Sequence, residues 1–576
     1  MSFLDFKPKF FECIKGYNAQ KFGQDAIAGL ITGIVALPLA IAFGIASGVS
    51  PVEGITTAII AGFIISLLGG SKVQIGGPTG AFIVIIYGII AQYGMGGLMT
   101  ATILAGLMLI LMGVFKLGTV IKFIPYPIII GFTAGIAVTI FTTQVGDICG
   151  FGVKTPGDFL GKWAVYAENI GKFNVWAFII SALTLLIIIF SPKAFKRVPG
   201  LNKIPGSLYG IIFGTVIYLV LNHFLPNQCE IETIGSKFGK IEASFKIVAP
   251  DLSYDSIRAM FPVAFTIAIL GAIESLLSAA VADGVIGDRH NSNTELIGQG
   301  IANVVSPFFG GIPATGAIAR TMTNINNGGR TPVAGIIHAI VLLIILLVLM
   351  PLAAYIPMAC LAGVLVIVSY NMSGWRTFRA MLHNPKSDVS VLLVTFFLTI
   401  IFDLTVAIEF GLILACLLLL RRVANVGHIT LQQGEISANN DSDVATSQDE
   451  ALQIPDGVQV YEIDGPFFFG IANKFEELSA NMLDVPLVRI IRMRKVPFVD
   501  ATGLHNLEVF VQNSHQQGIH VVLSGVRPEV LNVIRHSTLH GAIGEKNIFD
   551  HINGAMARAQ EVVAHPHVHH RVHSAK

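Results

Sequence analysis

The sequence predicts an all-α polytopic membrane domain of 14 transmembrane segments, built as a seven-plus-seven inverted repeat and followed by a small α/β domain. Three observations lead to this prediction: an apolar composition, a succession of apolar segments between residues 25 and 421, and a Thr-Gly-Ala motif that occurs twice in that region. The first places the chain in lipid, the second counts its crossings, and the third relates its two halves.

The composition is too apolar for a protein that is surrounded by water. Of the 576 residues, 53% are hydrophobic and only 13% are charged, and the mean hydropathy is +0.71. Such a chain needs lipid to cover its apolar surface. The formal net charge of +1 gives no reason to expect nucleic acid as a partner. We therefore expect an integral protein of the inner membrane.

No cofactor or resident metal is expected. The five cysteines lie far apart and lack the CxxC spacing of a zinc site or the pattern of a disulfide framework. No nucleophile-base pair or metal-ligand set indicates an enzyme. The N-terminal segment, residues 1–24, mixes acids, bases and aromatics without the pattern of a cleaved signal peptide, so it is expected to stay in the mature protein as a cytosolic segment.

Apolar segments with the length of a spanning helix recur along residues 25–422, the expected transporter domain. A spanning helix needs about 20 mostly apolar residues. The third and tenth segments are short and begin with Gly, Pro and Thr, so these two irregular segments call for a functional explanation. The predicted spans are 25–45, 53–70, 78–93, 97–115, 123–144, 174–191, 205–223, 258–281, 293–309, 315–326, 331–351, 356–371, 387–402 and 404–421.

Basic residues predict the orientation of the spans, because Lys and Arg accumulate in short cytoplasmic loops. If the N-terminus is inside, the even-numbered turns carry most of the basic side chains, including Lys72, Lys116, Arg289, Arg330 and Arg376. The odd-numbered turns carry almost none, apart from two longer loops in which acids balance the bases. Both termini are therefore expected to be cytoplasmic.

The chain changes character after Arg422. Residues 423–451 are predicted to be a flexible linker, because they are polar, acidic and poor in large apolar side chains. A compact α/β domain is expected over 452–562, where strand-like and helix-like runs alternate. The His-rich tail, 563–576, is expected to be a disordered polar end, with metal binding as the alternative. The strand-like runs are 459–463, 487–493 and 519–524, and the helix-like runs are 472–483, 502–516 and 527–536.

The membrane domain contains an internal repeat. The segment Gly77–Ala81 (GPTGA) resembles Pro313–Ala317 (PATGA), and the two Thr-Gly-Ala triplets lie 236 residues apart. The same interval pairs the first span with the eighth, which divides the domain into two halves of seven. An odd number of spans per half forces the halves into opposite orientations, as in the inverted repeats of secondary transporters.

The two triplets predict an anion site. Half-helices that begin near the middle of the bilayer direct unpaired N–H groups and partially positive ends at their surroundings. Glycine lets a ligand approach the backbone, and threonine supplies a hydroxyl. The alternative is that Gly and Pro only permit close helix packing. Because such segments occur at two repeat-related positions, we favour the anion site.

Two ionisable residues within the apolar region need a reason to be there, since insertion of such a group costs at least roughly 2.5–3.5 kcal/mol. Glu274 lies in the middle of the eighth span, with Ser278 one helical turn further along the same face. Arg320 follows the second triplet, and its fixed charge and forked donors suit a carboxylate or an oxyanion. Either Glu274 and Arg320 form a structural salt bridge, or Arg320 attracts the anion while Glu274 takes up a proton.

The chain resembles the sulfate permease (SulP) family, whose relatives include the animal proteins prestin and pendrin. The resemblance covers nearly the whole chain, and the C-terminal domain resembles the STAS domain that accompanies this family. It implies a core and a gate domain, a substrate held between the third and tenth helices, homodimers, and an elevator-like motion of the core. The resemblance rests on residues 28–51, 66–82, 270–277, 295–303 and 308–320.

The resemblance also implies site residues and partners. Glu274 is implied in a supporting role for ion coupling, which we extend to its neighbour Ser278, and a cytosolic protein is a possible partner of the STAS domain. The substrate-binding residues that the resemblance implies, including Arg320 in a supporting role, are Phe43, Thr79, Gly80, Ala81, Gly316, Ala317 and Arg320.

The sequence departs from its relatives at several positions. Pro38-Leu39 stands where many eukaryotic members have Pro-Gln, which removes one polar contact. Sodium-coupled bicarbonate members resemble the chain but have Asp at position 274, a hydroxyl at 318 and no Arg at 320, which favours a proton over sodium here. In the STAS domain, Ala501 replaces the phosphorylated serine of soluble relatives, so a phospho-switch is not expected at that position.

These observations predict secondary active transport of a small anion, with proton-coupled symport of a C4-dicarboxylate, sulfate or bicarbonate. The alternatives are a sodium-coupled bicarbonate transporter, an anion exchanger, a passive anion channel, and a membrane sensor that signals through the STAS domain without transport. The selected anion, the coupling ion and the STAS partner stay open.

Overall fold

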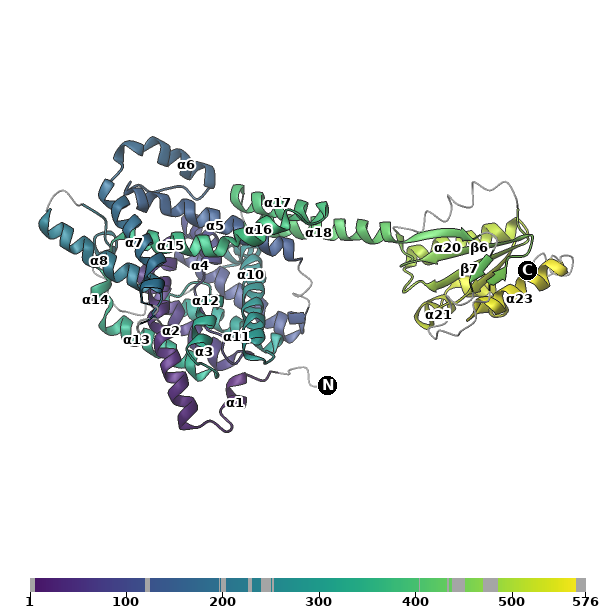
Figure 1. The fold of residues 1–576 in the computed structure, drawn as a ribbon, viewed down its shortest axis with the longest axis horizontal. Coiled ribbons are helices and arrows are strands. Elements are labelled where there is room, and N and C mark those ends of the chain that lie inside the picture. The colour runs from purple at the N-terminus through teal and green to yellow at the C-terminus, as the bar shows by residue number, and fades with distance from the viewer. Residues whose placement is uncertain are drawn as a thin grey trace. The chain divides into compact units, whose positions relative to one another are not determined.

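A computed structural model describes residues 6–119, 125–195, 197, 204–225, 230–239, 250, 253–402, 404–432, 435–437, 451–469 and 485–565. The chain forms two compact units, Met1–Ala415 and Cys416–Lys576, and each is described here by itself (Figure 1). Most of the predicted helix at 472–483, most of the acidic part of the predicted linker and nearly all of the His-rich tail lie outside the described residues.

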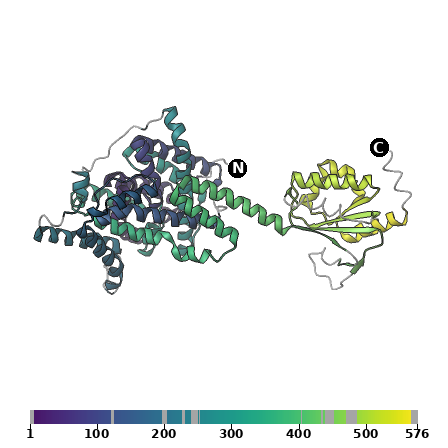
Figure 2. The same ribbon diagram turned by 90° about the horizontal axis from the view of Figure 1, so that it is seen from above.

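The first unit is a helical bundle, whose helices are viewed from a second direction in Figure 2. Its helices are α1 (Lys9–Cys13), α2 (Ala19–Ala46), α3 (Pro51–Leu68), α4 (Ile83–Val114), α5 (Tyr126–Cys149), α6 (Phe159–Glu168), α7 (Val175–Ala194), α8 (Gly206–Phe224), α9 (Ile234–Phe238), α10 (Tyr254–Ile286), α11 (Ser292–Val305), α12 (Ile318–Asn326), α13 (Val333–Val348), α14 (Met350–Ala353), α15 (Met358–Ser373), α16 (Trp375–Met381), α17 (Lys386–Ile401) and α18 (Leu404–Val426), which continues into the second unit. Short 3-10 turns occur at η1 (Gly80–Phe82), η3 (Ile170–Lys172) and η5 (Ser306–Phe309).

Each predicted span coincides with part of a helix, and within the described ranges eight helices are long and apolar enough to cross a membrane. The predicted third and fourth spans are the two arms of α4, which bends at Gly94, where φ is +64°. The ninth and tenth are shorter than a full crossing: α11 has 14 residues and α12 has nine. At a rise of about 1.5 Å per residue these helices reach only part of the way across a core of about 30 Å. The number of crossings therefore stays a prediction.

Small residues allow the central helices to pack closely. The Cβ of an alanine at Gly106 in α4 would lie 2.6 Å from the carbonyl oxygen of Gly300 in α11, and the reverse substitution gives the same 2.6 Å. No side chain fits between these two backbones, so both positions require glycine. Large apolar side chains face outward instead, as with Leu186 and Phe190 on α7, which are 50% and 55% exposed. This pattern is expected of a helix whose outer face meets lipid rather than water.

The second unit is the α/β domain that the sequence predicts. Its five-stranded sheet has the order β3-β6-β7-β8-β9, in which β3 is antiparallel to β6 and the remaining neighbours are parallel. Alternate strand residues form two hydrophobic clusters, one covered by α20, α21 and α22 and the other by α23. The elements are β3 (His428–Gln432), β6 (Val458–Asp464), β7 (Val488–Lys495), α20 (Ala501–Gln516), β8 (His520–Ser524), α21 (Pro528–Arg535), α22 (Thr538–Ile543), η7 (Glu545–Asn547), β9 (Ile548–Phe549) and α23 (Ile552–Ala564).

The predicted linker, 423–451, is wrong at its N-terminal end. Strand β3 lies within that range and pairs with β6 over five residue pairs, from His428 with Asp464 to Gln432 with Val460. Its apolar residues alternate with polar ones, and Ile429 is buried in the cluster under α20. A five-residue edge strand carries too few apolar residues to stand out from a polar segment. A two-stranded hairpin of β4 (Glu435–Ser437) and β5 (Ala451–Gln453) follows β3.

Candidate functional site

The two Thr-Gly-Ala triplets meet in space. Strand β1 (Gly76–Gly77) pairs antiparallel with β2 (Thr315–Gly316), with Gly76 opposite Gly316 and Gly77 opposite Thr315. A helical turn begins just after each strand, at Gly80 for η1 and α4 and at Ile318 for α12. Neither start has a side-chain cap among the described residues. The first N–H groups of both helices therefore lie beside the same two-stranded hairpin, available to a ligand.

Hydrogen bonds to α10 and α12 hold this hairpin in place. The N–H of Ala317 donates to the carbonyl of Ile75 at 2.9 Å, and the N–H of Ile75 donates to Oγ1 of Thr321 at 3.0 Å. The hydroxyl of Thr315 donates to the carbonyl of Gly271 in α10 at 2.8 Å. The Thr of the second triplet thus has a structural partner, whereas the Thr of the first triplet faces a carboxylate.

Glu274 joins the first triplet to α10. The hydroxyl of Thr79 donates to Oε2 of Glu274 at 2.9 Å, and both side chains are only half-buried. Ser278, one turn further along α10, is buried and its hydroxyl lies 3.4 Å from Oγ1 of Thr321 instead. The structure therefore brings Glu274 to the predicted site, while Ser278 contacts α12.

Arg320 lies against the backbone of the first triplet segment rather than against Glu274. Its side chain is 1% exposed, and Nη2 donates to the carbonyl of Pro78 at 3.0 Å. A Cβ at Gly77, whose φ is +152°, would lie 2.0 Å from Nη1 of Arg320. Within the described part of the chain, no ion pair joins Arg320 to Glu274, and Nη1 has no hydrogen-bond partner. The alternative of a structural salt bridge between them is thus wrong for this conformation.

The aromatic ring expected beside the site is there. A Cβ at Gly80 would lie 3.7 Å from Cε1 of Phe43 in α2. It would also lie 3.4 Å from Cδ1 of Ile140 in α5 and 3.4 Å from Sδ of Met372 in α15. Sequence reasoning missed Ile140 and Met372, because nothing in a local pattern tells which distant apolar helices will face a glycine.

The remaining predicted residues divide between the open and the closed side of the hairpin. Ala81 is buried, and a Cβ at Gly316 would lie 1.7 Å from Nε2 of Gln74, so both point into the protein. Ala317 is half-buried and Ile318 is 39% exposed, so these residues border the accessible side. The accessible surface near the hairpin is thus formed by the second helix start.

Asn303 in α11 is a supporting residue that the sequence analysis did not select. Its Nδ2 donates to the carbonyl of Ala314 at 2.8 Å, and its Oδ1 accepts from the N–H of the same residue at 2.9 Å. Both polar groups of Ala314, next to β2, are therefore satisfied by one side chain. A buried amide within an apolar segment is the signal that could have identified it.

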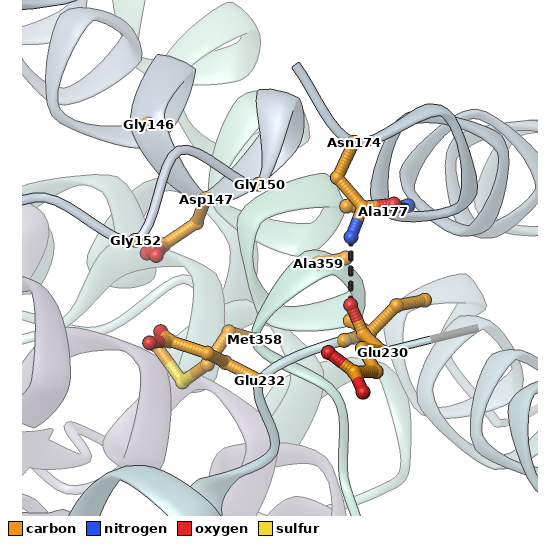
Figure 3. Close-up of a pocket in the computed structure, with 11 residues that line it drawn as sticks. Gly146, Asp147, Gly150, Gly152, Asn174, Ala177, Glu230, Glu232, Met358 and Ala359 are labelled. Atoms are coloured by element: carbon orange, nitrogen blue, oxygen red, sulfur yellow. Dashed lines mark hydrogen bonds between the residues drawn. The ribbon is translucent and has the colours of Figure 1, made fainter. Parts of the chain in front are cut away.

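A separate cavity of about 60 Å³ lies where α5, α7 and α15 begin or end (Figure 3). Asp147 and Glu232 face it, and Nδ2 of Asn174 donates to the carbonyl of Glu230 at 2.6 Å across its rim. Lys237 lies 3.4 Å from Asp147 and 3.7 Å from Glu232, so a protein cation already accompanies these carboxylates. The cavity shares no lining residue with the hairpin.

In the second unit, Asp500 caps α20. Its Oδ1 accepts from the N–H of Gly503 at 2.7 Å, and its Oδ2 accepts from the N–H of Phe469 at 3.3 Å. The next residue, Ala501, is exposed at the start of the helix and has no hydroxyl that a kinase could use. The geometry at this turn supports the expectation that a phospho-switch is not built at position 501.

Comparison with known proteins identifies the family. The model of the sulfate permease family matches residues 22–395, and that of the STAS domain matches residues 451–555. The chain therefore belongs to the sulfate permease family and is a multi-pass membrane protein with a C-terminal STAS domain. The family consists of membrane transporters rather than enzymes.

Particular relatives match over most of their length. A protein described as a putative sulfate transporter, YvdB, of Bacillus subtilis (strain 168) is 41% identical over 540 residues, which cover 93% of this chain and 98% of that protein. The bicarbonate transporter BicA of Picosynechococcus sp. is 31% identical over 517 residues, which cover 87% of this chain and 88% of that protein.

Solved structures have the same architecture. The transmembrane domain of a cyanobacterial BicA superimposes with a TM-score of 0.60 at 30% identity, covering 69% of this chain and 98% of that one. The murine anion transporter Slc26a9, in its inward-facing state, superimposes with a TM-score of 0.84 and covers 96% of this chain and 94% of that one. At 19% identity, the second likeness shows a shared fold alone.

Proposed function

We propose that this protein carries a small anion across the inner membrane by proton-coupled symport, with the anion bound at the paired helix starts beside β1 and β2. The observation that carries the proposal is the pairing of the two triplets, which brings two uncapped helix N-termini to one place. Helix starts attract anions through their free N–H groups and the partial positive charge of the helix dipole. Sulfate, bicarbonate and a C4-dicarboxylate are the candidate substrates, the first two supported by the names of the relatives.

The binding residues follow from the geometry at the hairpin. We assign Thr79, Gly80 and Ala81 of the first triplet, with Gly316 and Ala317 of the second, to contact with the anion. Phe43 packs beside Gly80 and limits the space available to the substrate. Arg320 acts on the anion through its charge, since its guanidinium is buried against the backbone of Gly77 and Pro78.

The contact between Thr79 and Glu274 supports coupling to a proton. A carboxylate that accepts a hydrogen bond from Thr79 at 2.9 Å lies where it would repel an anion bound at the first triplet. Like charges at such distances disfavour each other, so protonation of Glu274 and binding of the anion favour each other. Sodium is the second candidate, but the apolar side chain of Ile318 offers no oxygen ligand beside the site.

The wider assignment follows the same reasoning. We propose a homodimer with both termini in the cytoplasm, an inner membrane location, and a cytosolic protein partner for the STAS domain. Domain limits of 25–422 for the transporter and about 428–562 for the STAS domain agree with the helices and strands described above. An anion exchanger, a channel and a sensor without transport are the alternatives that the experiment below separates.

Uptake by purified protein in liposomes tests the function. Labelled sulfate, bicarbonate and succinate are offered with an inward proton gradient, an inward sodium gradient or neither. We expect the proton gradient to drive uptake above equilibrium in the wild type. Glu274→Gln is expected to keep anion exchange between the two sides and to lose the response to the proton gradient. The matched control is Glu409→Gln, an exposed carboxyl in α18, which is expected to behave as the wild type.

Each alternative predicts a different result. A Glu274→Gln variant that still concentrates substrate in response to pH would show that the proton is coupled elsewhere. Current without coupling to either gradient would identify a channel, and uptake driven only by sodium would identify a sodium symporter. No flux of any anion from active-conformation protein would favour a sensor.

A further inference from the structure

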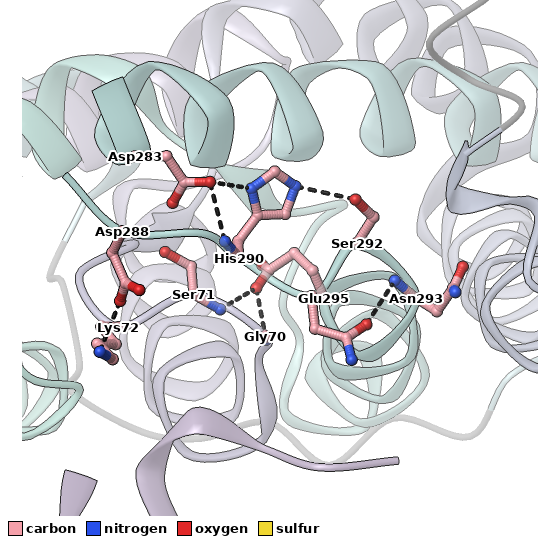
Figure 4. Close-up of polar contacts among 10 residues, drawn as sticks. Gly70, Ser71, Lys72, Asp283, Asp288, His290, Ser292, Asn293 and Glu295 are labelled. Atoms are coloured by element: carbon pink, nitrogen blue, oxygen red, sulfur yellow. Dashed lines mark hydrogen bonds and ion pairs between the residues drawn. The ribbon is translucent and has the colours of Figure 1, made fainter. Parts of the chain in front are cut away.

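Glu295 in α11 is a fully buried carboxylate with four hydrogen-bond donors. It is 0% exposed. Its Oε2 accepts from the backbone N–H groups of Gly70 at 2.8 Å and Ser71 at 3.0 Å. Its Oε1 accepts from the hydroxyl of Ser275 at 3.3 Å and from Nε2 of Gln299 at 3.0 Å. Figure 4 shows the carboxylate facing the backbone of Gly70 and Ser71 from α11. These donors use the acceptor capacity of a carboxylate in full.

The donors come from the segment that leads into the anion site. Residues 69–75 connect α3 to β1, and we call this segment the β1 arm. Glu295 holds the start of the arm directly. Near its end, Nε2 of Gln74 donates to the hydroxyl of Ser275 at 2.8 Å, and that hydroxyl donates to Glu295. One carboxylate therefore fixes the arm at two points, and Ser275 is the chain neighbour of Glu274.

The arm packs directly on the start of α11, so small displacements have no room. A Cβ at Gly70 would lie 2.1 Å from the carbonyl oxygen of Asn291, and the N–H of Asn291 donates to the carbonyl of Gly70 at 2.9 Å. On the other side, a Cβ at Gly298 would lie 3.0 Å from Cα of Gly69. The backbone of the arm is thus in van der Waals contact with the helix that carries Glu295.

Neighbouring polar contacts are more exposed and hold other parts of the turn (Figure 4). Lys72 pairs with Asp288 at 2.6 Å, but their side chains are 34% and 31% exposed. His290 lies 2.7 Å from Asp283 and 3.0 Å from the hydroxyl of Ser292, within the turn between α10 and α11. Exposed ion pairs contribute little to stability because water screens them. The buried contacts of Glu295 are therefore the main constraint on the arm.

We propose that Glu295 is a positioning residue for the anion site, which sets the place of Gly76 to Gly80 by fixing the β1 arm. The inference rests on the proposed function, because it assumes that the hairpin binds the anion. A glutamine at position 295 has the same shape but offers one acceptor oxygen and two N–H donors. It must leave either the two arm amides or Ser275 and Gln299 without an acceptor. The arm is then free to shift, and the helix start at Gly80 shifts with it.

The test compares Glu295→Gln with Asp25→Asn in the full-length protein. Asp25 is a matched control: it is 1% exposed and also accepts four hydrogen bonds, none of them from the β1 arm or the hairpin. Its donors are the hydroxyl of Tyr17, the N–H of Arg330, and the N–H and hydroxyl of Thr331. Two quantities are measured for each variant: the melting temperature without anion, and the concentration of sulfate or bicarbonate that gives half of the maximal thermal stabilisation or uptake rate.

We expect both variants to lower the melting temperature and only Glu295→Gln to raise the half-saturating anion concentration, by tenfold or more, with a smaller change in the maximal rate. Glu295→Asp, which keeps a carboxylate, is expected to recover part of the affinity. If Glu295→Gln does not fold, Ser275→Ala removes the link to Gln74 alone and is expected to raise half-saturation several-fold.

Three results would overturn the inference. An unchanged half-saturating concentration in a folded Glu295→Gln protein refutes the positioning role and leaves the proposed function intact. An equal rise in Asp25→Asn shows that any buried carboxylate of this unit has the same effect. A wild-type protein that is neither stabilised by nor able to move any anion of the panel refutes the proposed function itself, and this inference with it.

Discussion

Replacing Gly77 by alanine tests the placement of Arg320 behind the hairpin. A Cβ at this position would lie 2.0 Å from Nη1 of Arg320 and 3.4 Å from Cα of Ala58, and φ at Gly77 is +152°. Ordinary contacts begin at about 3.4 Å, so the guanidinium must retreat by roughly 1.5 Å. The retreat breaks the hydrogen bond from Nη2 to the carbonyl of Pro78, which measures 3.0 Å. The side chain has no solvent into which to move, because Arg320 is 1% exposed.

The structure supports a magnitude for this loss. A hydrogen bond to a charged group contributes about 1.5–3 kcal/mol, and overpacking of a full interior costs about 1–3 kcal/mol. With the unfavourable φ, the expected cost of Gly77→Ala is about 3–6 kcal/mol. For a unit of about 400 residues, an unfolding entropy of about 2.1 cal/mol/K per residue converts this cost into a drop of about 4–7 °C in melting temperature.

Thermal unfolding of the purified protein, followed by tryptophan fluorescence, measures this drop. The control is Gly88→Ala in α4, where a Cβ would meet no atom within 4 Å, and it is expected to change the melting temperature by less than about 1 °C. Arg320→Ala removes the obstacle, so Gly77→Ala should cost much less in that background than alone. If Gly77→Ala lowers the melting temperature equally in both backgrounds, the guanidinium does not occupy the space beside Gly77.

Two further predictions concern side chains that satisfy buried polar groups. Asn303→Leu leaves the N–H and carbonyl of Ala314 without partners and is expected to cost about 2–4 kcal/mol and to weaken anion-dependent thermal stabilisation, whereas Asn169→Ala, away from the hairpin, should leave that stabilisation unchanged. In the STAS domain, burial lowers the pKa of Arg489, whose Nη1 donates to the hydroxyl of Ser514 at 2.8 Å while Nε has no partner within the described chain. Ser514→Ala should therefore cost about 1–3 kcal/mol and Arg489→Met less than about 1 kcal/mol, measured as hydrogen exchange of β7, and the reverse order would contradict this account.

The location of the site could be predicted because its determinants are local and occur twice. The triplets at Thr79 and Thr315 each interrupt an apolar segment, and backbone irregularity at membrane depth is tolerated only where protein or water satisfies it. The repeat interval then relates the two interruptions. That argument requires the triplets to meet, and the pairing of Gly76 with Gly316 and of Gly77 with Thr315 confirms it.

The partners within the site could not be predicted, because they depend on which atoms approach in three dimensions. Sequence spacing placed Glu274 and Arg320 in neighbouring helices but could not show that Thr79 binds the first and the carbonyl of Pro78 binds the second. Backbone acceptors carry no sequence signal at all. For the same reason Glu295 was recognised only as part of a motif, since its most important donors are two backbone N–H groups.

The separation of Glu274 from Arg320 bears directly on coupling. Where the chain is described, the two charges have different partners, so protonation of Glu274 breaks no salt bridge and leaves the position of Arg320 unchanged. It changes the net charge beside the hairpin from zero to plus one. At an effective dielectric constant of about 20, a unit charge roughly 6 Å away contributes about 3 kcal/mol to the attraction of an anion. A proton and a monovalent anion that bind together return the site to its resting charge, and either one alone leaves an uncompensated charge in a low-dielectric environment. The energetic cost of that imbalance is sufficient to link the two binding events without a direct contact between them.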